Sequence, residues 1–399
     1  MIKMLDGNAA AVEAVAAAGV KVICAYPITP QSPISEQLSY LVDNNLLDAK
    51  CVRVESEHSA MSVVLGAQMT GVRAVTATSS VGLALMHEMM GSVSGVRIPT
   101  VMPIVNRSLS APWSLWCDHS DMMAERDAGW IHFYSENVQE VYDLILAAFR
   151  IAEHAEVLTP AMVGIDGFYL SHAMQKVRMF TPEEAADFVG PYVRKNSYLD
   201  PEDPMVVSCL TPTAEYTEVR YQQKAGLDRA LDVAEEVFAD FEKRTGRKLS
   251  LVEGYKTEDA EAVIVTMGSM SGTAKHTVNK MREQGKKVGV CKLTSFRPFP
   301  FKAIREILKD VPKIAVIDRS SALGAQGAPV WTEIAATMAG LPGTRDVRGY
   351  VAGIAGRDIH KQTIEDVFAD LMDKPRQDDA VWIDVKDDPM NIREVEHYG

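Results

Sequence analysis

The sequence predicts an α/β protein in which a doubly wound parallel sheet is followed by a smaller α/β domain. Strand-like segments alternate with helix-like segments from the amino terminus onwards. The strands are almost continuously apolar, which is typical of parallel strands covered on both faces. The same alternation begins again near residue 262. The 399 residues are enough for two or three domains at roughly 100–200 residues each.

The first domain is expected to begin with four strands, each close in sequence to a helix. These strands are predicted at 20–26, 51–55, 73–78 and 99–105, and the helices at 7–19, 33–46, 57–70 and 81–94. An apolar helix, AAFRIAEHA, and a further strand, PAMVGID, follow after residue 145. Ligands of such sheets bind outside the carboxyl ends of the strands, so the segments directly after the strands are candidates for a binding site.

The middle of the chain changes character. Residues 173–222 are polar and proline-rich, which indicates a long surface excursion of the kind that another subunit can cover. Residues 226–245 have the apolar spacing of an amphipathic helix, which ends at Gly246 after two basic residues. The second domain then follows, with strands predicted at 262–268, 287–293 and 313–318 and helices at 272–284 and 301–309. We therefore divide the chain into a first domain at 1–245, a second domain at 258–375 and a carboxyl-terminal tail at 376–399.

Composition restricts the class of protein. The net charge of −13 argues against nucleic acid or an anionic membrane surface as a partner. The five cysteines are scattered without a C-x-x-C pair, which favours reduced thiols in the cytoplasm and excludes an iron–sulfur cluster held by this chain alone. No uncharged apolar run reaches the roughly 18 residues of a membrane span. A cytoplasmic protein with small-molecule ligands is expected.

Three of the expected strands are followed by sequences with the residue types of a binding site, namely AYPITP, ATSSVG and VNRSLS. In the first of these, Pro27 and Pro30 restrict the backbone around Thr29. The Thr29 hydroxyl would therefore stand on a stiff arch at the edge of the sheet. A rigid turn between strand and helix explains the same residues without a ligand, and both interpretations stay open.

Glu57 begins the helix expected at 57–70. A carboxylate in the first turn gains about 0.3–1 kcal/mol from the helix dipole, so a capping role accounts for it. Alternatively, burial at the bottom of the crevice would raise its pKa and let it share a proton with a ligand nitrogen. The turn ATSSVG suits an anion or the polar edge of a ring, although turns of this kind are common.

The stretch from 106 to 130 is the least ordinary part of the sequence. Arg107 directly follows an apolar strand, and its planar guanidinium matches a carboxylate. The sequence DHSD at 118–121 contains metal-ligand residue types, but Asp and Ser before a helix are also good caps, so no metal site is expected. Trp113 and Trp116 lie in a loop, where they either bury the loop or form the wall of a pocket.

Taken together, several motifs resemble the α subunit of the pyruvate:ferredoxin oxidoreductase family. They are YPITP, ESEHSA, TATSSVGLALMHE, VNRSLSAP, DHSD, RDAGW, DGF-x-LSH and TSFRPFP, in order from about residue 5 to about residue 370. The resemblance implies a pyrimidine-binding first domain of the thiamine-diphosphate type and a second domain like the carboxyl-terminal domain of transketolase. It also implies oxidative decarboxylation of a 2-oxoacid to acyl-CoA and CO₂.

The resemblance further implies that this chain holds only half of the cofactor. A β subunit would supply Mg²⁺ and the diphosphate site through a G-D-G motif, which this chain lacks; IDG at 165–167 is the nearest match. Coenzyme A would be the co-substrate. Iron–sulfur clusters would lie on other chains, among them γ and ferredoxin-like δ subunits.

The resemblance also implies roles for individual residues, which we assign only at positions that match the family's motifs. Glu57 corresponds to the glutamate that hydrogen-bonds the pyrimidine nitrogen, Thr29 to the hydroxyl that contacts the substrate, and Arg107 to the arginine that faces it. The remaining expected residues lie beside the cofactor or the substrate: Pro27, Ile28 and Ser80 at the cofactor, and Trp113 and Trp116 in the substrate pocket.

Departures from the family leave the substrate open. This chain reads SAPWSLWCDHSD where relatives often read SAPINIWNDHSD, so Trp113 and Cys117 replace Ile and Asn beside the substrate. Pyruvate is the expected substrate, with phenylglyoxylate or a branched-chain 2-oxoacid as alternatives. Two other classes are also considered. One is an architectural subunit whose active site has decayed, and the other is a self-contained NAD-binding protein, against which the lack of G-x-G-x-x-G after the first strand argues.

Overall fold

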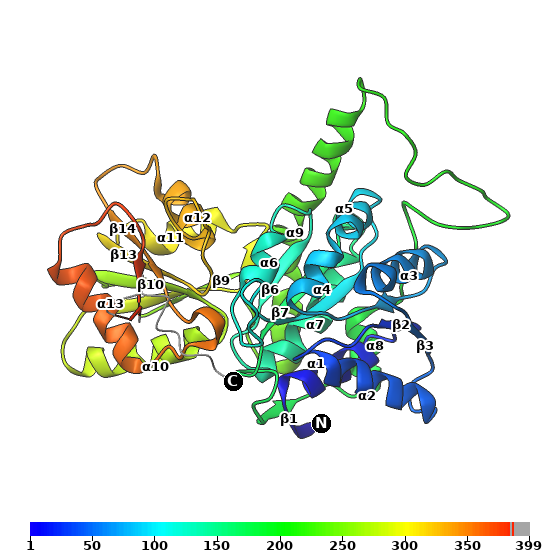
Figure 1. The fold of residues 1–399 in the computed structure, drawn as a ribbon, viewed down its shortest axis with the longest axis horizontal. Coiled ribbons are helices and arrows are strands. Elements are labelled where there is room, and N and C mark those ends of the chain that lie inside the picture. The colour runs from blue at the N-terminus through cyan, green and yellow to red at the C-terminus, as the bar shows by residue number, and fades with distance from the viewer. Residues whose placement is uncertain (384, 387–399) are drawn as a thin grey trace.

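A computed structural model describes residues 1–383 and 385–386 of the chain. The strands of the described residues build two α/β domains that pack side by side (Figure 1). Among the helices of the described residues, none has the length and apolar character needed to cross a membrane.

The sheet of the first domain runs in the order β12-β6-β7-β5, then β4-β2-β3. Its parallel strands are β2 (Val22–Ala25), β3 (Lys50–Arg53), β4 (Ala74–Val75), β5 (Val101–Asn106), β6 (Ile131–Tyr134) and β7 (Ala161–Asp166). The edge strand β12 (Ser295–Arg297) is antiparallel to β6 and comes from the part of the chain that follows the second-domain strand β11 (Val288–Leu293). Neither β6 nor β12 was among the predicted strands.

One proline divides this sheet into two parts. Between β4 and β5 the only bridge in the described ladder joins Thr78 to Ile104. The Pro103 carbonyl accepts from the Thr78 N–H (3.4 Å), so the Pro103 nitrogen also faces β4, and it carries no hydrogen to donate. The missing donor explains why the strand pairing is interrupted there while the strands keep their parallel order.

Helices cover both faces of the first sheet, as the sequence predicts. They are α1 (Gly7–Ala17), α2 (Ser32–Asp43), α3 (Glu57–Met69), α4 (Ser80–Leu85), α5 (His87–Gly95), α6 (Ser120–Ala124) and α7 (Val138–Ala152). The helix α7 is buried along nearly its whole length, because α1, the sheet and α9 (Tyr216–Thr245) pack around it. The single helix predicted at 81–94 is wrong in detail, since it is interrupted at Met86 and forms α4 and α5.

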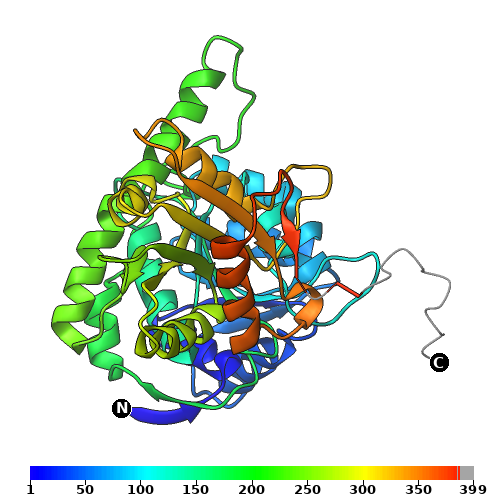
Figure 2. The ribbon, with the colours of Figure 1, turned by 90° about the vertical axis from the view of Figure 1, so that its left-hand side faces the viewer.

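The segment expected as a surface excursion is partly core. Within 173–222, β8 (Gln175–Arg178) pairs antiparallel with β1 (Ile2–Leu5), and α8 (Pro182–Val189) buries Phe188 against Phe241. The following loop and the first turns of α9 project away from the body in both views (Figure 1, Figure 2). The helix predicted at 226–245 therefore begins ten residues earlier, at Tyr216, where exposed residues hide its start from an apolar-spacing argument.

The second domain has one six-stranded sheet in the order β15-β14-β13-β10-β11-β9. Besides β11, its strands are β9 (Val252–Tyr255), β10 (Ala262–Met267), β13 (Lys313–Asp318), β14 (Asp346–Val351) and β15 (Val381–Trp382), and only β9 is antiparallel. Its helices are α10 (Met270–Glu283), α11 (Phe301–Leu308), α12 (Pro329–Met338) and α13 (Lys361–Asp373). Part of the expected tail, 376–399, thus forms β15; residues 384 and 387–399 lie outside the described residues.

Acid should destabilise the folded protein through His132. This histidine on β6 is buried, neither ring nitrogen has a hydrogen-bond partner among the described residues, and burial, assisted by Arg297, lowers its pKa to about 3. An unfolded histidine has a pKa of about 6.5. Below that pH the unfolded chain binds a proton that the folded chain does not, so stability is lost as the pH falls through this range.

The variant His132→Leu should lose this acid sensitivity. Between pH 7.5 and pH 5, its free energy of unfolding should fall by about 2 kcal/mol less than that of the wild type, as measured by urea unfolding. The exposed His276 on α10 provides the control, because His276→Leu should leave the pH dependence unchanged. Equal acid sensitivity of His132→Leu and wild type would contradict the prediction.

Candidate active site

Four loops that follow strands of the first domain meet at one edge of its sheet. They follow β2, β4, β5 and β7, and they carry the arch at 26–31, the turn at 78–80, the loop at 107–119 and the turn at 167–172; the segment after β3, which leads to Glu57, lies at the same edge beside Thr78. Because the carboxyl ends of parallel strands point to the same edge, this is where a doubly wound sheet binds its ligands. The three sequences singled out above are therefore neighbours in space.

The proline arch is fixed from two sides. The Asn8 side-chain amide donates to the Pro30 carbonyl (3.1 Å), and the Arg107 Nη1 donates to the Thr29 carbonyl (2.9 Å). Within the arch, the Gln31 N–H donates to the Ile28 carbonyl (2.8 Å). Thr29 itself is exposed. The arch thus presents a hydroxyl to the solvent side of the crevice while its backbone is held in place.

Arg107 is buried between the arch and its own loop. Its Nε donates to the Ser114 carbonyl (3.1 Å) in addition to the bond from Nη1, and the Trp113 ring centre lies 5.9 Å from the guanidinium carbon. Burial lowers the Arg107 pKa, although Asp121 opposes that shift. The third nitrogen, Nη2, has no hydrogen-bond partner among the described residues, so it remains available to a ligand.

Glu57 lies in a buried polar recess at the start of α3. The Ser56 hydroxyl, not Glu57, caps this helix by accepting from the Ser59 N–H (3.2 Å). Burial raises the pKa of Glu57. A Cβ at Gly82 would overlap both the Glu57 carboxylate and the Thr78 hydroxyl, so glycine at this position allows both groups to lie close to the backbone of α4.

Two hydroxyls beside this recess are unsatisfied. Thr78 Oγ1 and Ser79 Oγ are buried without a hydrogen-bond partner among the described residues. Ser80, which was expected to bind a cofactor, is engaged within the protein: its hydroxyl donates to the Ser108 carbonyl (2.5 Å) and its N–H to Asp121 (3.0 Å). Since buried polar groups normally have partners, Thr78 and Ser79 fit a polar ligand better than Ser80 does.

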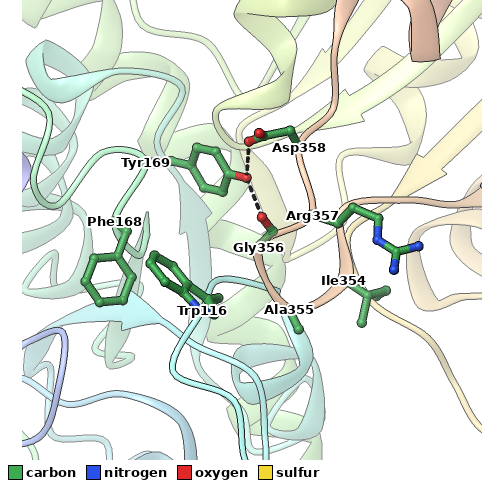
Figure 3. Close-up of a pocket in the computed structure, with 8 residues that line it drawn as sticks. All are labelled: Trp116, Phe168, Tyr169, Ile354, Ala355, Gly356, Arg357 and Asp358. Atoms are coloured by element: carbon green, nitrogen blue, oxygen red, sulfur yellow. Dashed lines mark hydrogen bonds between the residues drawn. The ribbon is translucent and has the colours of Figure 1, made fainter. Parts of the chain in front are cut away.

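The two tryptophans lie in different surroundings. Trp113 is 76% exposed beside Arg107, whereas Trp116 packs against Phe168, with ring centres 4.6 Å apart. Trp116, Phe168 and Tyr169 form one wall of a pocket of about 560 Å³, and residues 354–358 of the second domain form the other wall (Figure 3). Trp116 therefore faces the boundary between the domains, while Trp113 alone lies at the guanidinium.

A buried charge network joins the two domains. The Asp166 carboxylate at the end of β7 accepts from His119 Nε2 (2.8 Å) and from the Ser269 N–H (3.0 Å), and it lies 3.5 Å from Arg319 Nη1. Although burial opposes its ionisation, His119 and Arg319 hold the pKa of Asp166 well below its ordinary value. Asp166 is therefore an anion that both domains surround.

The same network contains a possible ligand set for a metal ion. Potential ligand atoms of Cys117, His119 and Asp166 lie within 4.8 Å of one another. However, the Arg319 guanidinium already balances the Asp166 charge and hydrogen-bonds the Cys117 thiol, whose pKa is raised by burial. A thiolate ligand is disfavoured by that burial, and a cation there would be repelled by Arg319, so we interpret the cluster as an ion network between domains.

Sequence reasoning missed this network. Asp166 and His119 were present in the quoted motifs, and the acid at the end of the apolar strand AMVGID was a usable signal. The partners Ser269 and Arg319 come from the second domain, and no local pattern relates them to Asp166.

Comparisons with known proteins agree on one family. Residues 13–239 match the thiamine-diphosphate-binding domain of pyruvate flavodoxin/ferredoxin oxidoreductases, and residues 260–364 match core domain II of pyruvate:ferredoxin oxidoreductase. The chain is 44% identical to the pyruvate synthase subunit PorA of Pyrococcus abyssi, covering 92% of each chain. It is 42% identical to PorA of Methanocaldococcus jannaschii (97% of this chain and 98% of the relative). It is also 41% identical to the ketoisovalerate oxidoreductase subunit VorA of Pyrococcus abyssi (99% and 97%).

A solved structure supports the fold. A 2-oxoglutarate:ferredoxin oxidoreductase from Magnetococcus marinus, with 2-oxoglutarate, coenzyme A and succinyl-CoA bound, superposes with a TM-score of 0.73 at 18% identity. The match covers 93% of this chain and 65% of that one. The expected α/β architecture is therefore confirmed.

Removing the Asp166 charge should uncouple the domains. Asp166→Asn leaves the Arg319 guanidinium buried without its counter-charge, and breaking a buried pair in this way costs about 3–5 kcal/mol. Calorimetry should show a lower and broader transition, or two transitions in place of one. Asp259→Asn, which removes a surface partner of Arg282, is the control and should change little. A wild-type transition in Asp166→Asn would contradict the role of the network.

Proposed function

This chain belongs to the pyruvate:ferredoxin oxidoreductase family, and we propose that it is the α subunit of a multi-subunit 2-oxoacid:acceptor oxidoreductase that oxidatively decarboxylates pyruvate. The observation that supports this most is the meeting of Glu57, Arg107 and Thr29 at one sheet edge, in the three loops whose motifs carry the family resemblance. The pyruvate synthase subunits at 42–44% identity support the choice of substrate.

Thiamine diphosphate is the cofactor we propose for this site. When bound, it supplies a carbon nucleophile and an acceptor for the electron pair that decarboxylation leaves behind. The recess in this chain fits the polar edge of its pyrimidine ring: it has a buried carboxyl group and two unsatisfied hydroxyls, and the carboxyl group and the Thr78 hydroxyl lie close against Gly82. Pro27 and Ile28 would line the same crevice from the arch.

Glu57 would hold a proton between its carboxyl group and the ring nitrogen. Burial raises its pKa, and a carboxyl group with a raised pKa shares a proton at neutral pH more readily than a solvated one. The hydroxyls of Thr78 and Ser79 would bind the other polar atoms at that edge, since they lack partners among the described residues. These groups fix the orientation of the ring.

Arg107 and Thr29 would act on the substrate. The free Nη2 of Arg107 can donate to an oxygen of the 2-oxoacid. Thr29, whose hydroxyl is on an exposed residue, is held beside Arg107 because the Thr29 carbonyl accepts from Arg107 Nη1. A carboxylate that is bound too strongly would resist its loss as CO₂. Because only interactions that strengthen in the transition state accelerate a reaction, Arg107 should stabilise charge on the former keto oxygen more than it clamps the carboxylate.

The remaining parts of the enzyme would lie on partner subunits. This chain has no G-D-G sequence, so a β subunit would supply Mg²⁺ and the diphosphate site. The acyl group would pass to coenzyme A, and electrons would pass to iron–sulfur clusters on other chains, including γ and ferredoxin-like δ subunits. The scattered cysteines suit a reducing cytoplasm.

The substrate is tested by turnover of the purified native complex with a viologen dye as acceptor. We expect at least a tenfold preference for pyruvate over 2-oxoisovalerate and phenylglyoxylate, which is about 1.4 kcal/mol of transition-state binding, and dependence on coenzyme A. Preference for 2-oxoisovalerate would follow the VorA relative, and preference for phenylglyoxylate would assign Trp113 to an aromatic pocket. No turnover with any of the three would refute the proposal.

Glu57→Gln should abolish most of the activity of the complex. The amide cannot take up a proton from the ring nitrogen, and loss of a positioned acid–base group typically costs 10²–10⁴-fold in rate, so we expect a decrease of roughly that size. Turnover and thiamine diphosphate binding are both measured. Glu55→Gln on the preceding exposed position is the matched control. Full turnover in Glu57→Gln would instead favour an architectural subunit.

A further inference from the structure

Asp121 has an unusual position within the candidate site. It lies in the short helix α6 and is 1% exposed, and its carboxylate accepts four N–H groups. Oδ1 accepts from the Asn106 side-chain amide (2.9 Å) and from the Met122 N–H (2.8 Å). Oδ2 accepts from the N–H groups of Ser80 and Arg107, both at 3.0 Å. One side chain therefore binds the loop after β4 and the loop after β5.

We propose that Asp121 is a positioning residue, which sets the loop that presents Thr78 and Ser79 and the loop that presents Arg107 in fixed register with each other. This inference rests on the proposed function, because it assigns those two loops to one reaction. Both Asp121 oxygens are already occupied by N–H groups of the chain itself, so this carboxylate is not left free for a ligand. It acts through Arg107, whose backbone it holds directly.

The backbone of Ser80 supports a positioning role. Ser80 has a φ of 48°, in the left-handed region that non-glycine residues avoid. Such a conformation costs about 1–3 kcal/mol and persists only where the surroundings fix it. Here Asp121 binds the Ser80 N–H, and the Ser80 hydroxyl binds the Ser108 carbonyl in the other loop. The strained turn is thus held by contacts that also connect the two loops.

The cost of burying the Asp121 carboxylate also supports a positioning role. Burial raises the pKa of Asp121 to about 6, even though Asn106, Arg107, Ser80 and Met122 all donate to it. A helix cap does not require such burial, because a solvated Asp or Ser caps equally well. The carboxylate is retained inside, where its bonds are strong and directional.

Asparagine is the sharpest replacement at this position. It has the shape of aspartate, but one of its two terminal groups is an NH₂ donor. Each Asp121 oxygen accepts two N–H groups, so either orientation of the amide places NH₂ against two donors. Asp121→Asn should therefore release one pair of contacts without creating a cavity.

The test uses the assembled complex carrying Asp121→Asn. We expect kcat/KM for pyruvate to fall about 100-fold, the size of effect that a misplaced catalytic group produces, while the complex remains assembled. Asp143→Asn is the matched control: Asp143 is equally buried, pairs with Arg247 at 2.8 Å, and lies on α7 away from the site. It should lower thermal stability and leave kcat/KM unchanged. Equal loss of kcat/KM in both variants would overturn the proposal.

A double-mutant cycle with Arg107→Ala separates positioning from general support. If Asp121 acts through Arg107, adding Asp121→Asn to the Arg107→Ala variant should lower kcat/KM by less than about threefold. The two effects are not independent in that case. A further 100-fold loss in that background would overturn the proposal.

Amide hydrogen exchange provides a readout that does not depend on turnover. In Asp121→Asn, faster exchange is expected either in the peptides that contain the Ser80 and Arg107 N–H groups or in the peptide that contains the Met122 N–H, according to which oxygen the NH₂ group replaces, and not in α7. Wild-type exchange in all of these peptides would overturn the inference. A wild-type complex that turns over no 2-oxoacid, combined with faster exchange in the variant, would refute the proposed function and leave the structural role of Asp121 standing.

Discussion

Asp166 keeps a negative charge fully buried at the point where the first-domain sheet ends against the second domain. A buried anion is stable only when donors and a counter-charge surround it. His119 supplies one donor from the loop after β5, and Ser269 and Arg319 supply the rest from the second domain. The charge of Asp166 is therefore satisfied only when the domains are docked. That docking also fixes the loop at 107–119, because the His119 N–H donates to the Arg319 carbonyl (2.8 Å).

The second domain consequently takes part in shaping a site that lies on the first. It contributes β12 to the edge of the first sheet, and the Ala355 and Gly356 N–H groups bind Asp118 and the Cys117 carbonyl. Trp116 is held in the resulting boundary, whereas Trp113 remains beside Arg107. The loop thus has one end anchored to the second domain, and its other end carries Arg107, whose Nε binds the Ser114 carbonyl. A replacement at this boundary in either domain can therefore change the position of the loop that carries Arg107.

Local patterns were sufficient for much of the fold, and they selected the loops in which the site residues are proposed. Apolar runs between helices predicted β2, β5, β7, β10 and β13, and the family motifs placed Glu57 and Arg107 in loops at strand ends. The features that were not predicted are contacts between residues far apart in the sequence. The strand β12 forms only because β6 offers it an edge, β15 joins a sheet from an expected tail, and Ser269 meets Asp166 across 103 positions of sequence. Pairings of this kind depend on which surfaces dock, and no short window of residues records that.

The side chain and the backbone of Arg107 have different polar partners. Its guanidinium donates to the neutral carbonyls of Thr29 and Ser114, and no carboxylate among the described residues forms an ion pair with it. Asp121 approaches the backbone N–H of Arg107 instead of the side chain. A carboxylate at the guanidinium would neutralise the charge that a 2-oxoacid requires, while its complete absence would leave a buried cation unsupported. Placing the acid behind the backbone holds Arg107 in position, and in the proposed reaction it would leave the Arg107 charge for the oxygen that becomes more negative as CO₂ departs.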